Sequence, residues 1–223
     1  MLKQKCNFAL FMAVFYFVWM IRATLIYDAL DQFIQAEGWR LVFSNVVKFT
    51  LWVLPAMGYI IRCNQEPVLK SLKVNTPIRK KGLILVSLVS VLYFVLVLGV
   101  EFFLSQRTLE PLFRSSTWAV FHTSLEVFFS PITEELFFRG FVLNEIVTRL
   151  GFSKANLLQA FLFTSMHWPN WIWINGFQSQ IVITSISIFI LALLLGWATK
   201  RTNSIWPPVA IHFINNFLAA FLG

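Results

Sequence analysis

Residues 131–140 read PITEELFFRG and place two adjacent carboxylates and an arginine inside an otherwise apolar part of the chain. Glu134, Glu135 and Arg139 lie within six residues of one another. A charge at the centre of a bilayer costs about 2.5 to 3.5 kcal/mol even on the most permissive scale. Groups kept at that cost indicate either a functional site or an ion pair that locks helices together.

The composition is that of an integral membrane protein. Of the 223 residues, 58% are hydrophobic and 13% are charged, against about 45–50% and about 25% in a typical soluble domain. Nine Trp and 25 Phe add to the apolar surface. Most of a chain of this length is needed for membrane spans, so we predict one integral membrane domain over residues 1–223.

Seven apolar segments come close to the length of a membrane span, which takes about 20 helical residues. They cover residues 7–27, 41–61, 82–104, 118–150, 156–173, 180–199 and 205–222. The fourth segment would be about 48 Å long as a helix, too long for one straight crossing. Pro131 lies within it and predicts a kink or a break. The sequence therefore predicts an all-α, polytopic bundle of about seven helices with a kinked fourth helix.

The basic residues predict the orientation of this bundle. With a cytoplasmic N-terminus, twelve of the eighteen Lys and Arg residues fall on the cytoplasmic side and three on the outside. This bias is the positive-inside pattern of a multi-pass protein of the cell (inner) membrane, and it explains the net charge of +8 without nucleic acid. Lys3 and Lys5 precede the first span and no cleavage site follows, so we expect a retained anchor. Cys6 and Cys63 match no metal or disulfide pattern.

Within the fourth span, Glu135 and Arg139 are spaced i, i+4 and can pair on one helix face. Glu134 points about 100° away from Glu135, so we expect the two carboxylates to lie in different environments. The simplest division is that Arg139 holds Glu135 while Glu134 faces a polar cavity. A structural ion pair explains Glu135 and Arg139 alone, but it gives no reason for the second carboxylate.

Polar residues on two other spans lie at a matching depth. His167 is in the fifth span, and His212 and Asn216 are spaced i, i+4 in the seventh. Counting from the cytoplasmic side puts both histidines about 16 Å into the membrane. A lone histidine would suggest a hydrogen bond between helices, whereas two at one depth, with an asparagine and two carboxylates, predict a shared site.

These residue types suit the attack of water on an amide carbonyl. A carboxylate can act as general base on water, and asparagine and histidine can donate hydrogen bonds to an oxyanion. No serine or cysteine is placed as an obvious nucleophile, and there is no HExxH helix. Glu134, His167 and His212 could also bind one divalent metal ion, such as zinc, with an open position. The metal-dependent and metal-free versions both stay open at this point.

Three motifs in order, EExxxR at residues 134–139, FxxxH at 163–167 and HxxxN at 212–216, resemble the CPBP intramembrane proteases. These are relatives of the type II CAAX prenyl endopeptidase and include bacteriocin-processing and immunity proteins. The adjoining residues FRGF at 138–141 and SIWPP at 204–208 are similar too. The resemblance covers residues 118–223, whereas the first three spans match only as hydrophobic helices.

The resemblance implies an all-α catalytic core over residues 118–223, with a cavity open to the cytosol, and accessory spans over residues 1–104. It implies that Glu134 activates water and that His167 binds or orients this water. It further implies that His212 and Asn216 form the oxyanion site, supported by the pair of Glu135 and Arg139. Of the two mechanisms proposed for the family we prefer the glutamate type without metal.

The compact chain looks bacterial, so the expected partner is a peptide or protein substrate at the membrane other than a prenylated CAAX protein. The sequence does not predict an oligomeric state. His122, Glu126 and Ser130 follow at i, i+4 and i+8; they would line a polar path, or Glu126 would pair with Lys48 or Arg22, which we favour. A non-catalytic immunity or scaffold protein and a small transporter remain as alternatives, although inverted repeats typical of transporters are absent.

Overall fold

A computed structural model of the chain describes residues 6–26, 37–64, 66–105 and 127–222. The described residues form helices and contain no strand, which confirms the all-α prediction. In chain order the elements are α1 (Phe8–Ile21), the π-helix η1 (Arg22–Ile26), α3 (Glu37–Tyr59), the π-helix η2 (Ile60–Asn64), α4 (Val68–Ser71), α5 (Lys80–Ser105), the π-helix η4 (Leu136–Val142), α7 (Leu143–Leu150), α8 (Phe152–Ser165), α9 (Trp168–Asn175), α10 (Ser179–Thr202) and α11 (Trp206–Leu222). Residues 127–135 are also helical and lead directly into η4.

Four helical segments among the described residues are long and apolar enough to cross a membrane: Phe8–Leu25, Val42–Asn64, Lys80–Val97 and Ser179–Thr202. They coincide with the first, second, third and sixth predicted spans. The fourth predicted span begins outside the described residues, so its kink at Pro131 stays a prediction. The seventh corresponds to α11, with 17 residues.

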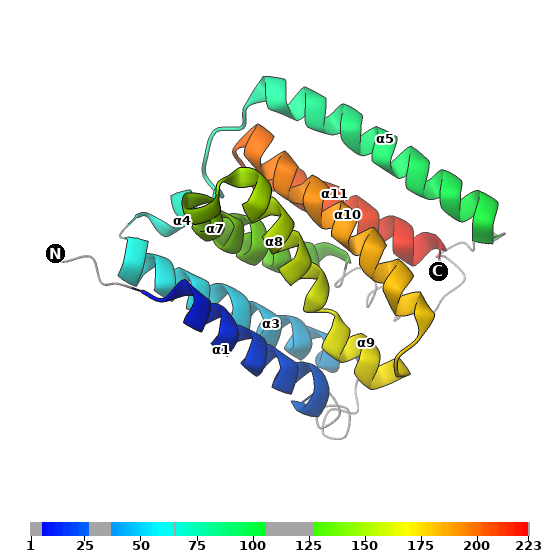
Figure 1. Cartoon of the computed structure of the whole chain (residues 1–223), viewed down its shortest axis with the longest axis horizontal. Helices are drawn as coiled ribbons and strands as arrows, with labels where there is room; N and C mark the ends of the chain where they lie inside the picture. Colours follow the sequence, from blue (N-terminus) through cyan, green and yellow to red (C-terminus); the bar gives the residue numbers. More distant parts are fainter. Residues whose placement is uncertain (1–5, 27–36, 65, 106–126, 223) are drawn as a thin grey trace.

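The fifth predicted span is not one continuous helix, and this part of the prediction is wrong. A turn at Met166 and His167 separates α8 from α9, as Figure 1 shows. Pro169 stands in the first turn of α9. Proline has no backbone N–H and its ring clashes with the preceding turn, so it ends α8 and suits the start of α9.

Aromatic side chains fill the core between α1, α3 and η4. Trp52 and Phe137 are fully buried, and the ring of Phe137 stacks on that of Phe15 with centroids 4.3 Å apart. Edge-to-face contacts then join Trp52 to Trp19 at 4.8 Å and to Phe15 at 5.5 Å. Aromatic rings bury large apolar areas and prefer such offset or edge geometries, so this packing holds the segment after Glu134 and Glu135 in place.

Helix α5 lies along one edge of the bundle, beside α10 and α11 (Figure 1). Val86 of α5 packs in a small buried cluster with Leu195 and Ile211. The other side of α5 exposes large apolar residues such as Ile84 and Leu88. An exposed apolar helix face is expected where the solvent is lipid.

The basic loops that we predicted on one side of the membrane lie together at one end of the bundle, which we call the basic end. Four contacts join the helix ends there. Two involve the end of η2: the disulfide of Cys63 with Cys6 and the contact of Asn64 with Glu145. The other two involve the end of α10: Arg79 N donates to Thr202 O (2.9 Å), and the Lys200 ammonium lies over the Phe152 ring (4.0 Å). The relative placement of these loops agrees with the predicted topology. This agreement concerns only which loops share one end of the bundle, and it does not say which side of the membrane that end faces.

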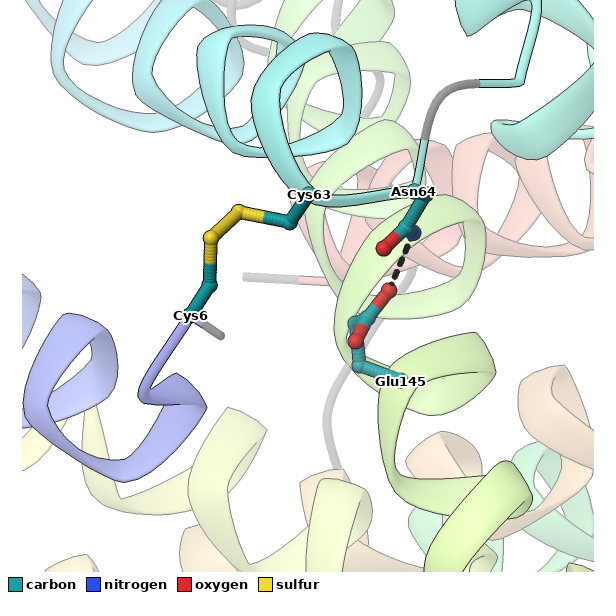
Figure 2. Close-up of a disulfide and its surroundings, with 4 residues drawn as sticks. All are labelled: Cys6, Cys63, Asn64 and Glu145. Atoms are coloured by element: carbon teal, nitrogen blue, oxygen red, sulfur yellow. Dashed lines mark hydrogen bonds between the residues drawn. A yellow bond between two sulfur atoms is a disulfide. The ribbon is translucent and has the colours of Figure 1, made fainter. Parts of the chain in front are cut away.

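Cys6 and Cys63, which match no disulfide pattern in the sequence, form a disulfide in the structure. The two residues are 57 positions apart in the sequence but have a Cα–Cα distance of 5.9 Å. Figure 2 shows the bond between them, with the side chain of Asn64 beside it donating to Glu145 of α7. Cys6, two residues before α1, and Cys63 in the last turn of η2 meet because both lie at the basic end.

Helices α8 and α10 pack closely at Gly196. A Cβ atom added there would lie 1.9 Å from Oδ1 of Asn156 and 2.9 Å from Nε2 of Gln159. The same two amides donate to backbone carbonyls of α10, from Asn156 to Leu193 O (3.0 Å) and from Gln159 to Ala192 O (3.0 Å). Only glycine leaves room for these bonds.

Replacing Gly196 by alanine should therefore destabilise the protein by about 1–3 kcal/mol, the usual effect of overpacking. Thermal unfolding of the detergent-purified protein would measure this. Gly58→Ala is the matched control, because a Cβ at Gly58 meets nothing within 4 Å and alanine is the better helix former by about 0.8–1.0 kcal/mol. Equal losses of stability in both variants would show that the close contact of α8 with α10 at Gly196 does not determine the stability of the protein.

Candidate active site

A cavity of about 370 Å³ lies among the helices and is lined by residues from several elements. Four predicted site residues line it: Glu134, His167, His212 and Asn216. They come from residues 127–135, from the turn before α9 and from α11. The structure thus brings these side chains to one cavity, while their chemical roles stay predictions.

Glu134 is almost completely buried, with 3% of its surface exposed. Its Oε1 accepts a hydrogen bond from Ser130 Oγ at 2.8 Å and forms an ion pair with the ammonium of Lys48. Its Oε2 lies 3.6 Å from Nε2 of His212. The carboxylate is held from three sides.

Glu135 and Arg139 form a fully buried ion pair, with Nη1 of Arg139 donating to Oε1 of Glu135 at 2.9 Å. The guanidinium stands over the ring of Phe163, 4.3 Å from its centroid. Nη2 of Arg139 also reaches the backbone carbonyl of Ala192 at 3.4 Å. This is the pair that the i, i+4 spacing predicts.

His212 lies between the two carboxylates. Its Nδ1 is 2.8 Å from Oε1 of Glu135, while its Nε2 faces Glu134. The expectation that Glu134 and Glu135 occupy different environments is therefore wrong. The two side chains leave the helix about 100° apart, but an imidazole has nitrogen atoms on two sides and can reach both.

The contact with Glu135 determines which nitrogen of His212 carries a proton. An ionised carboxylate only accepts hydrogen bonds, so Nδ1 must donate to Glu135. In the neutral ring Nε2 then has a free lone pair toward Glu134 and the cavity. Glu135 thus orients a histidine as well as pairing with Arg139.

His167 occupies the turn before α9 and not the middle of a long helix. Its ring stacks on Trp171, with centroids 5.2 Å apart, and meets the ring of Phe163 edge-on at 5.4 Å. Its Nε2 is buried and has no hydrogen-bond partner in the described part of the chain. This nitrogen is free to bind a water molecule or a substrate.

Asn216 lies one helical turn after His212 and is partly buried at the cavity wall. Its side chain adds an amide, which has both donor and acceptor atoms, to the polar lining of the cavity. Its neighbour Asn215 also lines the cavity and lies 3.5 Å from the hydroxyl of Tyr93. The middle of α11, which lines the cavity, is therefore polar over two consecutive residues.

Lys48 of α3 is a site residue that sequence reasoning missed. We expected Glu126 to pair with Lys48 or Arg22, but Glu126, like His122, lies outside the described residues. In the structure Lys48 contacts Glu134 and also Ser130, at 2.6 Å, and its ammonium stands 4.9 Å from the ring centroid of Trp52. The signal was present, since a lysine inside a span needs a carboxylate partner.

A divalent metal ion at this site would have to share the carboxylate of Glu134 with the Lys48 ammonium. Within the described ranges, no group of three or more His, Cys, Asp or Glu side chains is placed to hold a metal. The Lys48 ammonium already contacts the carboxylate of Glu134. A cation beside the carboxylate disfavours a second cation at the same place.

The fold and site together define a helical membrane protein with a buried, charged cavity suited to hydrolysis. Residues 115–218 match the family described as type II CAAX prenyl endopeptidase Rce1-like. The match includes all three motifs and confirms the resemblance inferred from them: over these residues the chain is similar to the CPBP/CAAX protease family. No curated protein and no solved structure matched the chain. The family supports a protease-like enzyme that acts on a peptide at the membrane.

Arg139→Ala should reduce the free energy of unfolding by about 3–5 kcal/mol, because it leaves Glu135 buried without its cation. Detergent-solubilised protein would be compared by thermal unfolding and by its yield in membranes. Arg149→Ala removes an exposed arginine of the same region, whose guanidinium lies 5.3 Å from the Phe8 ring, and should cost no more than about 1 kcal/mol.

The double variant Arg139→Met/Glu135→Gln removes both charges and should recover part of the lost stability. If the double variant were as unstable as Arg139→Ala, the unpaired charge of Glu135 would not be the cause of the loss.

Proposed function

We propose that this protein is an intramembrane endopeptidase of the glutamate type, which hydrolyses a peptide bond with water and no metal. One observation carries the proposal: Glu134, His167, His212 and Asn216 line a single cavity inside the helix bundle. Such a cavity combines a carboxylate base, two histidines and an amide donor. Water excluded from bulk solvent can be activated and directed there.

In the proposed reaction, a water molecule lies between Glu134 and the free Nε2 of His167. Glu134 removes a proton as the water oxygen bonds to the carbonyl carbon of the substrate. The carbonyl oxygen becomes an oxyanion and accepts a hydrogen bond from the Asn216 amide. When the C–N bond breaks, the proton is delivered to the leaving amine.

In this proposal, His212 carries that proton. Its Nε2 lies 3.6 Å from Oε2 of Glu134, and the lone pair on that nitrogen follows from the bond of Nδ1 to Glu135. Once it holds a second proton, Nε2 can also donate to the oxyanion, which is the role that the resemblance implies. Glu135 and Arg139 act through His212 by fixing its orientation, as a carboxylate does in hydrolase triads.

Lys48 acts as a positioning residue in this scheme. Its ammonium pairs with Oε1 of Glu134, which leaves Oε2 toward His212. A fixed carboxylate loses less entropy on reaching the reactive geometry. The accessory helix α3 thereby takes part in the site, although the family motifs lie on other helices.

Glu134→Gln should lower peptide hydrolysis by about 10²–10⁴-fold, the usual contribution of a general base, while the protein still accumulates in membranes. The measurement is a mass-spectrometric comparison of peptide termini in membranes of cells that carry the wild type, the variant or no copy. Cleavage products that depend on the wild type should be missing with the variant.

Glu145→Gln is the matched control, because Glu145 of α7 contacts Asn64 at the basic end and does not line the cavity. It should leave the products unchanged. Incubation of wild-type membranes with a strong chelator should also leave hydrolysis unchanged, whereas loss with recovery on added zinc would contradict the metal-free mechanism. Full activity of Glu134→Gln would contradict the proposed hydrolase and favour a non-catalytic immunity or scaffold function.

We further propose that the basic end faces the cytoplasm. The excess of Lys and Arg in these loops favours that side. The disulfide of Cys6 and Cys63 favours the opposite side, since disulfides are rare in a reducing cytoplasm. We give more weight to the charge bias, because it extends over several loops, and infer that the two thiols are reduced in the cell.

A single cysteine at Asn75, an exposed position in the loop before α5, tests this orientation in a Cys6→Ser/Cys63→Ser background. In intact cells, a membrane-impermeant maleimide should not label Asn75→Cys, but it should label the same protein after the membranes are opened. Labelling of intact cells would place the basic end outside.

A further inference from the structure

A second cavity, of about 870 Å³, lies at the basic end between α5 and α10 and is separate from the candidate active site. Five of its lining residues are cationic, and none is acidic: Arg79, Lys80, Lys81, Lys200 and Arg201. All five side chains are exposed. Within the described part of the chain none of them has an ion pair.

The two walls of this basic pocket are held close together. A Cβ added to Gly82 would lie 2.1 Å from the carbonyl oxygen of Arg201, so the start of α5 touches the end of α10. Arg79 N also donates to Thr202 O at 2.9 Å. The backbone therefore fixes the two groups of cations beside each other, although like charges repel.

Two observations show how strongly positive this region is. The first turn of α5 contains Lys80 and Lys81 and no acidic residue, although a helix N-terminus disfavours cations. Burial and then the charge of Arg79 lower the pKa of the nearby Lys73. An anion in the pocket would offset the unfavourable placement of Lys80 and Lys81 at the helix start. It would also offset the repulsion between Arg79 and Lys73.

The position of the pocket indicates what kind of anion it takes. It lies where two candidate membrane spans, Lys80–Val97 and Ser179–Thr202, begin and end, which is the level of lipid headgroups. Phe152 and Trp197 line it, and aromatic residues favour that interface. Next to the pocket, the apolar face of α5 is open, with Ile84 and Leu88 about two-thirds exposed at 65% and 64%.

We propose that this basic pocket binds the headgroup of an anionic phospholipid, with an acyl chain along the exposed face of α5. Basic pockets between membrane helices commonly bind such headgroups. The cations supply the charge for the phosphate, and the open apolar face distinguishes a lipid from free phosphate. Arg201 of the pocket is about 15 Å along α10 from Leu191 of the candidate active site, so the proposal does not depend on hydrolysis.

The test is native mass spectrometry of the full-length protein in a nonionic detergent, titrated with phosphatidylglycerol, with phosphatidylcholine of the same chains, or with inorganic phosphate. The wild type should retain one phosphatidylglycerol in preference to phosphatidylcholine. Lys200→Gln/Arg201→Gln should weaken that binding about 30-fold. Lys80→Gln/Lys81→Gln removes the same charge from the other wall and should give the same loss.

The matched control is Lys70→Gln/Lys154→Gln, which removes two exposed lysines that do not line the pocket. It should bind phosphatidylglycerol as the wild type does. Equal binding of the two lipids, equal loss in the control, or competition by inorganic phosphate at equal concentration would each overturn the proposal. In that case the basic residues would serve only to orient the protein in the membrane.

Discussion

The buried ion pair of Glu135 and Arg139 is the interaction on which the candidate site depends. Neither side chain is exposed, so each charge is tolerable only with the other beside it. From this pair, contacts continue through His212 to Glu134 and on to Lys48. With a neutral histidine, the two cations and two carboxylates cancel. The series is therefore neutral as a whole and connects α3, the helix before η4, and α11.

The aromatic residues give this polar series its geometry. The single ring of Phe163 contacts three of the polar groups: the guanidinium of Arg139 and the rings of His167 and His212. On the opposite side, Trp52 touches the ammonium of Lys48 and packs against Phe138. Rigid rings limit the rotamers of the polar groups between them, which is a requirement of a preorganised site.

The sequence predicted best what depends on local spacing. The pair of Glu135 and Arg139 follows from i, i+4 periodicity, and the helical class follows from composition. What it could not predict depends on contacts between distant segments. Lys48 and Glu134 are 86 residues apart, and nothing in the spacing of α3 identifies which carboxylate the lysine meets. Cys6 and Cys63 meet only because the segment before α1 and the end of η2 both reach the basic end. The turn at His167 reflects Pro169, a local signal that we underestimated.

The π-helix η4 has a consequence for the length of this part of the chain. A π-turn takes about one residue more than an α-turn, which rotates everything after Val142 by about 100° relative to a continuous α-helix. That rotation directs Asn144 to Ser71 O of α4 at 2.8 Å, in addition to its bond to Gly140 O, four residues earlier in the chain, at 2.7 Å. Deleting one residue from η4 would restore a regular helix and turn Asn144 away from Ser71 at the end of α4. The segment therefore behaves as a one-residue insertion that evolution can remove only by rebuilding the short helix it faces.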